Sequence, residues 1–391
     1  MSNIHSQTRI KGKVEPISMI PDKISEEITE TDDRRFREVV SAELDERRIR
    51  QVSTPQATYP RQERVLAVHW HPEFVPMETI RRRVDAMFPN KRDELIIPTQ
   101  HNEILCYDDY AGVEVDCYSK GFNQKVQLLL HFEKERVENA GRLREMLAHT
   151  FKYRSSQLFE FLHTLTRPIP ERMEVAARRT GAAEALVAFV QVHARKIERL
   201  LDSHIAEVPP QSIKNKLIRN FFDRLREDYG DPVIDRAQTF LGEVKKEVKA
   251  EFPLQYFYRT REIIEEARAL DAGIVIPHPE QFWPILLAEY DVDGIEVWNP
   301  QSHRYTEFLV SVLNKKNQER GGRRRPLLVF MGDDTHMGEK TREPAQQNAQ
   351  KAAREIGLQP AWDDLSIRKS LILANSSRSK VMAEYRSRLA G

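Results

Sequence analysis

The sequence predicts an α/β fold: a distorted seven-stranded (β/α)7 TIM-like barrel with a large α-helical insertion between strands 4 and 5. The first observation is a set of seven short apolar runs, the composition expected of buried parallel strands. The second is that each run ends on a histidine or a carboxylate, and barrels of such strands carry their working side chains at the carboxyl ends. The runs span residues 64–71, 94–101, 111–116, 126–132, 272–279, 293–299 and 326–336.

The first part of the chain divides into an extension and a block of strands. Residues 1–62 are strongly charged, which predicts a polar, partly helical N-terminal extension with one helix around 33–50. This extension could pack on the barrel or dimerise. Residues 63–133 hold strands 1–4; a helix over 77–88 separates the first two strands, and the later connections are short.

The rest of the chain is a helical insertion followed by the return to the barrel. Apolar residues recur at helical spacing over 134–260, which predicts helices and no strand. Residues 261–391 hold strands 5–7 and C-terminal helices, and the helix at 261–273 leads into strand 5. A lid or a dimer arm are the two roles that suit the insertion.

Bulk composition excludes some classes of protein. The 61 basic and 60 acidic residues leave a net charge of +1, which gives no argument for a dedicated nucleic-acid binder. No run approaches the roughly 18 apolar residues of a membrane helix, and no signal peptide is recognisable. Two cysteines, Cys106 and Cys117, form no disulfide framework or zinc-knuckle spacing, so a cytoplasmic protein is expected.

Pairs of ligand-type residues at spacing i, i+2 suggest metal binding. Side chains alternate along a strand, so His69 and His71 share a face and could reach one ion, as could Asp334 and His336. Imidazole and carboxylate suit zinc, manganese or iron. Glu114 has two carboxylate oxygens and could bridge two ions, in the manner of two-metal hydrolytic sites.

Each histidine taken alone has a plainer interpretation. His131 follows three leucines and could be a hydrogen-bonded core residue, and His101 or His278 alone means little. The joint pattern at successive strand ends favours a metal cluster. By contrast, packing or solvent is the better interpretation for the insertion histidines, which are His149, His163, His193 and His204.

The order of these motifs resembles the polymerase-and-histidinol-phosphatase (PHP) superfamily of metal-dependent phosphoesterases. The resemblance covers 65–133 and 261–340. It rests on six elements in order: the His-x-His of AVHWH, Thr99-Gln100-His101, Gly112-Val113-Glu114-Val115, His131, Pro277-His278-Pro279 and Asp334-Thr335-His336. Gln100 departs from the aspartate usual in the second motif, and PEFVPME after His71 departs from the usual Ser-Asp-Gly.

The resemblance implies a distorted barrel with two or three ions. It assigns three ligand sets: His69, His71, Glu114 and Asp334 for the first ion; Glu114, His131 and His278 for the second; His101 and His336 for a third. The expected cofactors are divalent Mn, Zn or Fe.

The leading hypothesis is a phosphoesterase that activates water at this metal centre. Glu114 and Asp334 are the expected catalytic carboxylates, and Asp334 or His303 could move protons. Arg304 and Lys340 could bind a distal phosphate. The expected partner is a small phosphorylated substrate, nucleotide or oligonucleotide, with no membrane; a homo-oligomer through the insertion is possible.

Two alternatives stay open from the sequence. An amidohydrolase-like enzyme that cleaves C–N or C–O bonds would also open with His-x-His, but such barrels usually have eight strands and often a bridging lysine. A metal-binding regulatory or partner-binding module without turnover is the other alternative. Metal analysis combined with a substrate screen separates the three.

Overall fold

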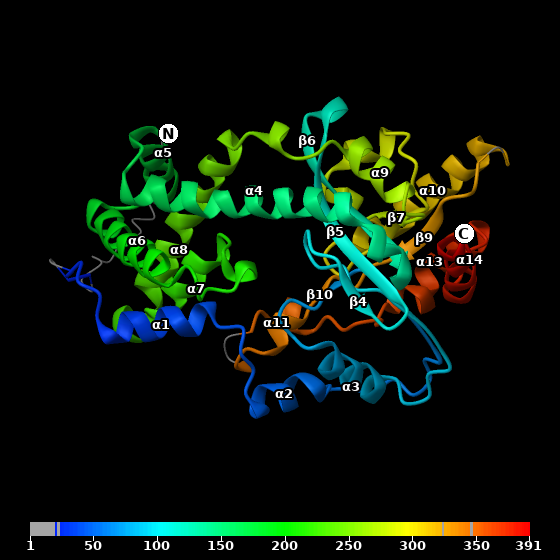
Figure 1. The fold of residues 1–391 in the computed structure, drawn as a ribbon, viewed down its shortest axis with the longest axis horizontal. Coiled ribbons are helices and arrows are strands. Elements are labelled where there is room, and N and C mark those ends of the chain that lie inside the picture. Colours follow the sequence, from blue (N-terminus) through cyan, green and yellow to red (C-terminus); the bar gives the residue numbers. More distant parts are fainter. Residues whose placement is uncertain (1–19, 22–23, 323, 345–346) are drawn as a thin grey trace, which may run out of the picture. The chain divides into compact units, whose positions relative to one another are not determined.

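The computed structural model describes residues 20–21, 24–322, 324–344 and 347–391 (Figure 1). The chain forms two compact units. The sheet unit comprises residues 42–155 and 253–391, and the helical unit comprises 156–252 together with the described residues up to Ser41. The fold is therefore mixed α/β, as the alternation of apolar runs and helical stretches predicts.

The sheet unit holds a six-stranded sheet in the order β4-β5-β6-β7-β8-β9. Strands β7, β8 and β9 are parallel to one another, and helix α10 (Thr306–Arg320) lies between β8 and β9 in the chain. The six strands are β4 (Leu105–Tyr107), β5 (Tyr110–Ser119), β6 (Gln124–Glu133), β7 (Gly273–Ile276), β8 (Gly294–Trp298) and β9 (Leu328–Met331).

Strands β4 to β7 pair in antiparallel fashion, which corrects the expectation of parallel strands throughout. β5 and β6 form a long hairpin around the one-turn helix η1 (Lys120–Phe122) and Asn123, whose φ is +48°. A parallel pair needs a crossover of a dozen or more residues, so a connection this short requires a hairpin. β4 was not predicted from the sequence.

Two further pairs of strands complete the sheet unit. β1 (Arg64–Ala67) pairs in parallel with β3 (Asp93–Ile96), and β2 (Trp70–His71) with β10 (Thr335–His336). A parallel bridge between His101 and Glu114 links the chain after β3 to β5, and the Asp334 amide donates to the His69 carbonyl at 2.9 Å. These contacts join the three sheets, and the closed seven-stranded barrel stays a prediction.

The two faces of the six-stranded sheet differ in chemistry. One face is apolar: Val113, Leu128, Ile274 and Val329 belong to the largest hydrophobic cluster, together with Leu309 of α10. The opposite face bears Glu114 and Leu129, which are cross-strand partners, and packs against α14 (Arg378–Ala390). A side chain at Gly273 would overlap the Tyr385 ring, so glycine is needed where α14 meets β7.

The sheet unit also contains several helices besides α10 and α14. The predicted helix 77–88 is present as α3 (Met77–Met87), and the helix feeding strand 5 as α9 (Thr260–Arg268). The others are α2 (Glu46–Ser53), the first part of α4 (Gly141–Thr166), α11 (Met337–Lys340), α12 (Ala349–Ala352) and α13 (Leu365–Leu373).

The helical unit packs α1 against the helices of the insertion (Figure 1). Its core combines Phe36 of α1 with residues such as Phe189, Phe222 and Phe240. Its helices are α1 (Glu30–Val40), the end of α4, α5 (Pro170–Thr180), α6 (Glu184–His204), α7 (Lys216–Arg224) and α8 (Arg226–Glu251), and α8 is kinked at Gly230. Helices occupy most of residues 141–251, and the bounds 134–260 expected for the insertion stay a prediction.

The N-terminal extension differs from the prediction of a single helix around 33–50. Two helices, α1 and α2, are separated by Ser41–Asp45, and Asp45 caps α2 by accepting from the Arg48 amide. They belong to different units, because Asp32 pairs with Lys196 at 2.9 Å within the helical unit, whereas Gln51 donates to the Lys340 carbonyl in the sheet unit. In the described part of the chain, no helix has the length and apolar character required to cross a bilayer.

Candidate metal centre

The first predicted pair converges as its spacing indicates. His69 and His71 lie on either side of Trp70, directly after β1, and both are about 1% exposed. Their ring centroids are 5.5 Å apart. Together with Asp334 they form a group whose candidate ligand atoms all lie within 4.8 Å of one another.

Glu114 faces histidines on both of its carboxylate oxygens. Its Oε2 lies 2.6 Å from His101 Nδ1 and 3.6 Å from His71 Nε2, and its Oε1 lies 3.5 Å from His278 Nε2. Strand β5 brings Glu114 to this position, and the bridge between Glu114 and His101 fixes the neighbouring loop. Each oxygen of one carboxylate therefore faces a different set of imidazoles.

Asp334 is the second carboxylate of the cluster. Its Oδ1 lies 3.4 Å from the Nε2 atoms of His71 and His336 and 3.7 Å from that of His69. Its φ of +46° is uncommon for a residue with a side chain, and such backbone is typical of functional sites.

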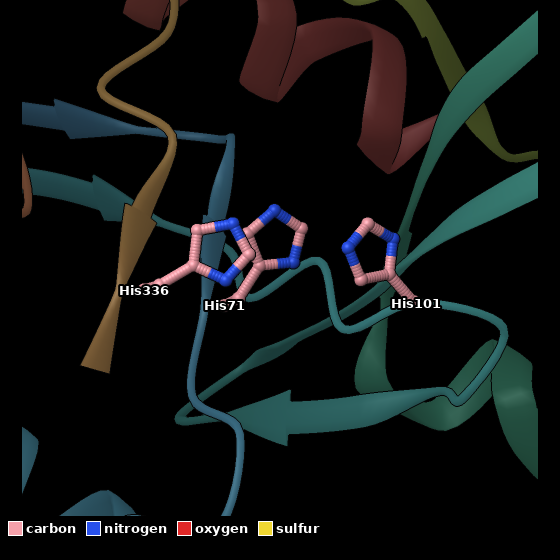
Figure 2. Close-up of side chains that lie close together, drawn as sticks. All are labelled: His71, His101 and His336. Atoms are coloured by element: carbon pink, nitrogen blue, oxygen red, sulfur yellow. The ribbon is translucent and has the colours of Figure 1, made fainter. Parts of the chain in front are cut away.

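Three overlapping groups of side chains could each hold an ion. They are His69, His71 and Asp334; His69, Glu114 and His278; and His71, His101 and His336. In the third group, shown in Figure 2, the His71 ring stacks 4.3 Å from His336 and 4.5 Å from His101, measured between centroids. Segments far apart in the sequence therefore bring their imidazoles to one place.

The donor atoms fit divalent ions. Both Glu114 oxygens and His69 Nε2 are buried, and none has a hydrogen-bond partner with acceptable geometry among the described residues. A buried carboxylate in that condition is costly unless a cation compensates it. The three groups contain nitrogen and oxygen donors and no thiolate, a set that suits zinc, manganese or iron.

The electrostatics divide the ligands. Burial acts to lower the pKa of His69, His278 and His336, but Glu296 raises that of His69 to about 10, Glu114 raises that of His278 and Asp334 raises that of His336, so a metal would displace a proton from these three. Burial, reinforced by His336 and His101, lowers the pKa of His71 to about 3, and burial also lowers that of His101. Burial acts to raise the pKa of Glu114, but His101 and His278 hold it well below its usual range. Neutral imidazoles and ionised carboxylates are the species that coordinate metals.

His69 is held from behind by Glu296, a residue to which the sequence analysis gave no role. Its Nδ1 lies 2.9 Å from Glu296 Oε1, and the other Glu296 oxygen accepts from the His278 amide at 2.6 Å. A side chain at Gly332 would overlap Glu296, so glycine leaves room for this contact. Carboxylates behind ligating histidines fix the ring and its tautomer. Its place at the end of the sixth apolar run was the available signal.

Arg354 and Gln301 hold the second oxygen of Asp334. Arg354 Nη1 donates to Oδ2 at 2.7 Å and to the Asp334 carbonyl at 3.0 Å, and Gln301 Nε2 donates to Oδ2 at 2.8 Å. Asp334 thus presents Oδ1 to the histidines while Oδ2 is fixed. Nothing in the local sequence around Arg354 or Gln301 signals these contacts.

Glu73 and Gln100 lie at the edge of the cluster. Glu73 Oε1 is 3.4 Å from His336 Nδ1, so Glu73 contacts the cluster. Gln100, which replaces the aspartate usual in the second motif, accepts from the Glu73 amide at 3.2 Å. Glu78 lies away from the cluster and pairs with Arg82.

His131 is a correction to the predicted ligand set. Its Nδ1 lies 2.6 Å from the Tyr385 hydroxyl and its Nε2 lies 2.9 Å from the Val68 carbonyl, so both ring nitrogens are already engaged. Burial lowers its pKa to about 3. The structure supports the plainer interpretation, a hydrogen-bonded core histidine that ties α14 to the chain before His69.

Lys340 is a second correction, because it is buried and cannot face a substrate phosphate. Its Nζ donates to Glu355 at 2.7 Å and to the Ala352 carbonyl at 2.5 Å. His303 and Arg304 are exposed on the short helix η7 (His303–Tyr305), and His303 is in none of the three groups. Arg304 lies over the Tyr305 ring.

Asp116 also stays out of the groups, although it shares a strand face with Glu114. Lys125 Nζ and Arg154 Nη1 contact it at 2.6 and 2.8 Å, and Asn102 donates to it at 3.1 Å. Burial acts to raise its pKa, but Arg154 and Lys125 lower it. Its charge is compensated locally, whereas that of Glu114 faces only imidazoles.

Comparisons with known proteins identify no family. No protein-family model matches the chain, and no curated protein matches it. A solved structure described as a putative metal-dependent phosphoesterase from Bifidobacterium adolescentis aligns over 81% of this chain and 98% of its own, with 15% identity and a TM-score of 0.44. A likeness at this level carries no argument about fold or activity.

Proposed function

We propose that this chain is a metal-dependent hydrolase of phosphate esters, organised like members of the PHP superfamily. The observation that carries the proposal is Glu114: a buried carboxylate, held ionised by its surroundings, whose two oxygens face the imidazoles of different histidines. A carboxylate so placed is suited to bridge two cations.

The residues divide naturally among two or three ions. His69, His71, Asp334 and Glu114 would hold one ion, and Glu114 with His278 a second. His71, His101 and His336 offer a third position. Bound divalent ions supply Lewis-acid stabilisation of phosphate oxygens and a water of lowered pKa.

The protein's own side chains orient these ligands and leave one side open. Glu296 fixes His69, and Arg354 with Gln301 fixes Asp334. His101 and His336 retain 29% and 23% exposure of their side chains, against 1% for His69 and His71. A phosphate group would therefore approach on the side of His101 and His336.

Asp334 acts as a ligand in this proposal rather than as a proton donor. Burial acts to raise its pKa, but His336 and His71 hold it well below the usual range, so the carboxylate stays ionised. His303 as the group that moves a proton to the leaving oxygen stays a prediction. The amidohydrolase alternative is less favoured, because Glu114 takes the position between the histidine sets that a bridging lysine often holds in that class.

The proposal is tested by elemental analysis of the purified chain followed by an activity panel. The panel holds phosphomonoesters, phosphodiesters and nucleotides, each assayed with manganese, zinc or iron. We expect bound metal and turnover of at least one phosphoester, both reduced in His69→Ala. Metal binding without turnover of any phosphoester would contradict the proposed activity and favour a regulatory module; amide or ester hydrolysis alone would favour the amidohydrolase class.

A further inference from the structure

A cavity lies on the sheet unit, at the opposite end of β1 from the metal centre. Its volume is ≈ 980 Å³, and it is lined by the segment leading into β1 and by the segment joining α13 to α14. Arg64 begins β1, and His69 lies five residues further along the extended chain, a span of about 16 Å. The cavity is therefore separate from the candidate metal centre.

The lining of this cavity carries an excess of positive charge. Arg61, Arg64, Arg368 and Arg378 line it, and within the described chain no carboxylate forms an ion pair with the first three. Of the two acids in the lining, Glu63 pairs with Arg92 at 3.5 Å, and Asp363, which is 83% exposed, pairs with Arg378 at 3.7 Å. The guanidinium groups thus outnumber the acids that could neutralise them.

Arg378 is the most buried of the four. Its side chain is 14% exposed, and its terminal nitrogens reach carbonyls of Gln359 and Arg64 only at 3.4 and 3.5 Å. Its Nε is buried without a hydrogen-bond partner among the described residues. Burial lowers the pKa of Arg378, and Asp363 offsets this. A guanidinium has five donors, so an acceptor entering the cavity would relieve an existing deficit.

The N-terminus of α14 adds further donors at the same place. Ser377 caps this 13-residue helix, and Ser376, Ser377 and Ser379 all line the cavity. The first amides of a helix have no intrahelical partner, and the helix dipole favours an anion there. Arginine side chains, hydroxyls and free amides are together the donor set that recognises a phosphate group.

We propose that this cavity binds the phosphate group of a small molecule, independently of the metal centre. The group would lie between Arg378 and the N-terminus of α14, with Arg61, Arg64 and Arg368 around it. Free inorganic phosphate and a small phosphate monoester share this chemistry. The proposal does not depend on the phosphoesterase assignment.

The test is calorimetric titration of the full chain with inorganic phosphate, at constant ionic strength maintained with chloride. It uses wild type, Glu114→Gln to disable the metal centre, and the double variant Arg61→Gln/Arg368→Gln. Both of these arginines are exposed, so their replacement does not threaten the fold. Arg142→Gln is the matched control, an exposed arginine on α4 outside the cavity.

We expect Glu114→Gln and Arg142→Gln to keep a phosphate site that the double variant weakens about tenfold or more. Repeating the titration with glycerol phosphate distinguishes the two sources: tighter binding of the ester indicates a phosphorylated metabolite, and tighter binding of inorganic phosphate indicates the free ion. The proposal is overturned if the double variant binds phosphate as Arg142→Gln does, or if Glu114→Gln shows no phosphate binding.

Discussion

The two compact units bury histidines in different surroundings. In the sheet unit, His69 and His71 face the carboxylates of Asp334 and Glu114. In the helical unit, His193 is 2% exposed among the rings of Phe189, Phe222 and Tyr229. Neither nitrogen of His193 has a hydrogen-bond partner in the described part of the chain, and it belongs to none of the three candidate metal groups.

This difference shows which property marks a candidate site. Burial lowers the pKa of His71 to about 3 and that of His193 to about 4, so a lowered pKa does not distinguish the two. The distinguishing feature is the ionised Glu114 carboxylate, whose two oxygens face the imidazoles of different histidines. Convergence of several histidines on one buried carboxylate is what indicates a cation.

The substitution Glu114→Gln tests most strongly whether this carboxylate distinguishes the histidines of the sheet unit from His193. The substitution keeps the size of the side chain but removes its charge and one of its two acceptor oxygens. We expect bound metal to fall and activity to drop by more than the 10–100-fold that loss of an outer partner of a metal ligand typically causes. Elemental analysis and a phosphatase assay measure both. Full metal content with full activity would contradict the role given to Glu114.

Replacing Arg354 tests whether the orientation of Asp334 matters. Arg354→Met removes two hydrogen bonds to Asp334 but leaves the ligand itself in place. We expect a 10–100-fold loss of metal affinity or activity, with partial rescue by excess metal. Gln301→Ala should also lower metal affinity or activity, but by less, because it removes only one contact to Asp334. Unchanged metal affinity in Arg354→Met would reduce Arg354 to a structural role.

His193→Phe tests whether the buried histidine of the helical unit affects stability alone and not metal binding. Protonation of His193 is disfavoured by burial and by Lys196 and Arg35, against the opposing effect of Asp32 and Asp228. Because the folded pKa of about 4 lies below the unfolded value of about 6.5, the unfolded chain binds the extra proton. The neutral His193 therefore stabilises the folded chain above pH 6.5. As the pH falls towards 4, this contribution to the free energy of unfolding, about 3 kcal/mol, is lost.

We therefore expect His193→Phe to lose less stability than wild type between pH 6.5 and 4, with unchanged metal content and activity at neutral pH. Thermal midpoints measured across this pH range, with and without the substitution, provide the check. A variant that binds less metal would show that His193 acts on the centre after all.

For His131→Leu, the structure and the family resemblance predict different results. The resemblance assigns His131 to the second ion, whereas the structure engages both of its nitrogens with Tyr385 and Val68. We expect unchanged metal content and a loss of stability of about 1–3 kcal/mol from the unsatisfied partners. Loss of one equivalent of metal at retained fold would restore His131 to the ligand set.

Sequence spacing predicted the convergence of ligands well, because strand periodicity is a local property. The i, i+2 pairs and the apolar runs placed His69, His71, Glu114 and Asp334 at strand ends, and the structure brings them together. The direction of β5 and β6 was missed, because the apolar pattern of a buried strand is the same in parallel and antiparallel sheets. The short connection between them was the neglected signal.

The supporting residues were harder to predict because they act over long sequence separations. Arg354 contacts Asp334 from a loop 20 residues away, and Tyr385 reaches His131 across 254 residues. Lys340 was assigned to substrate from its charge and its proximity to Asp334 in the sequence, but its burial beside Glu355 depends on tertiary packing. Charge alone does not predict which way a side chain points.

Anomalous X-ray diffraction from crystals of the metal-loaded chain tests the central claim most directly. We expect anomalous peaks about 2.0–2.2 Å from the two Glu114 oxygens, with His69, His71, His278 and Asp334 completing the coordination. No anomalous density within coordinating distance of Glu114, in a chain shown by elemental analysis to carry metal, would contradict the account.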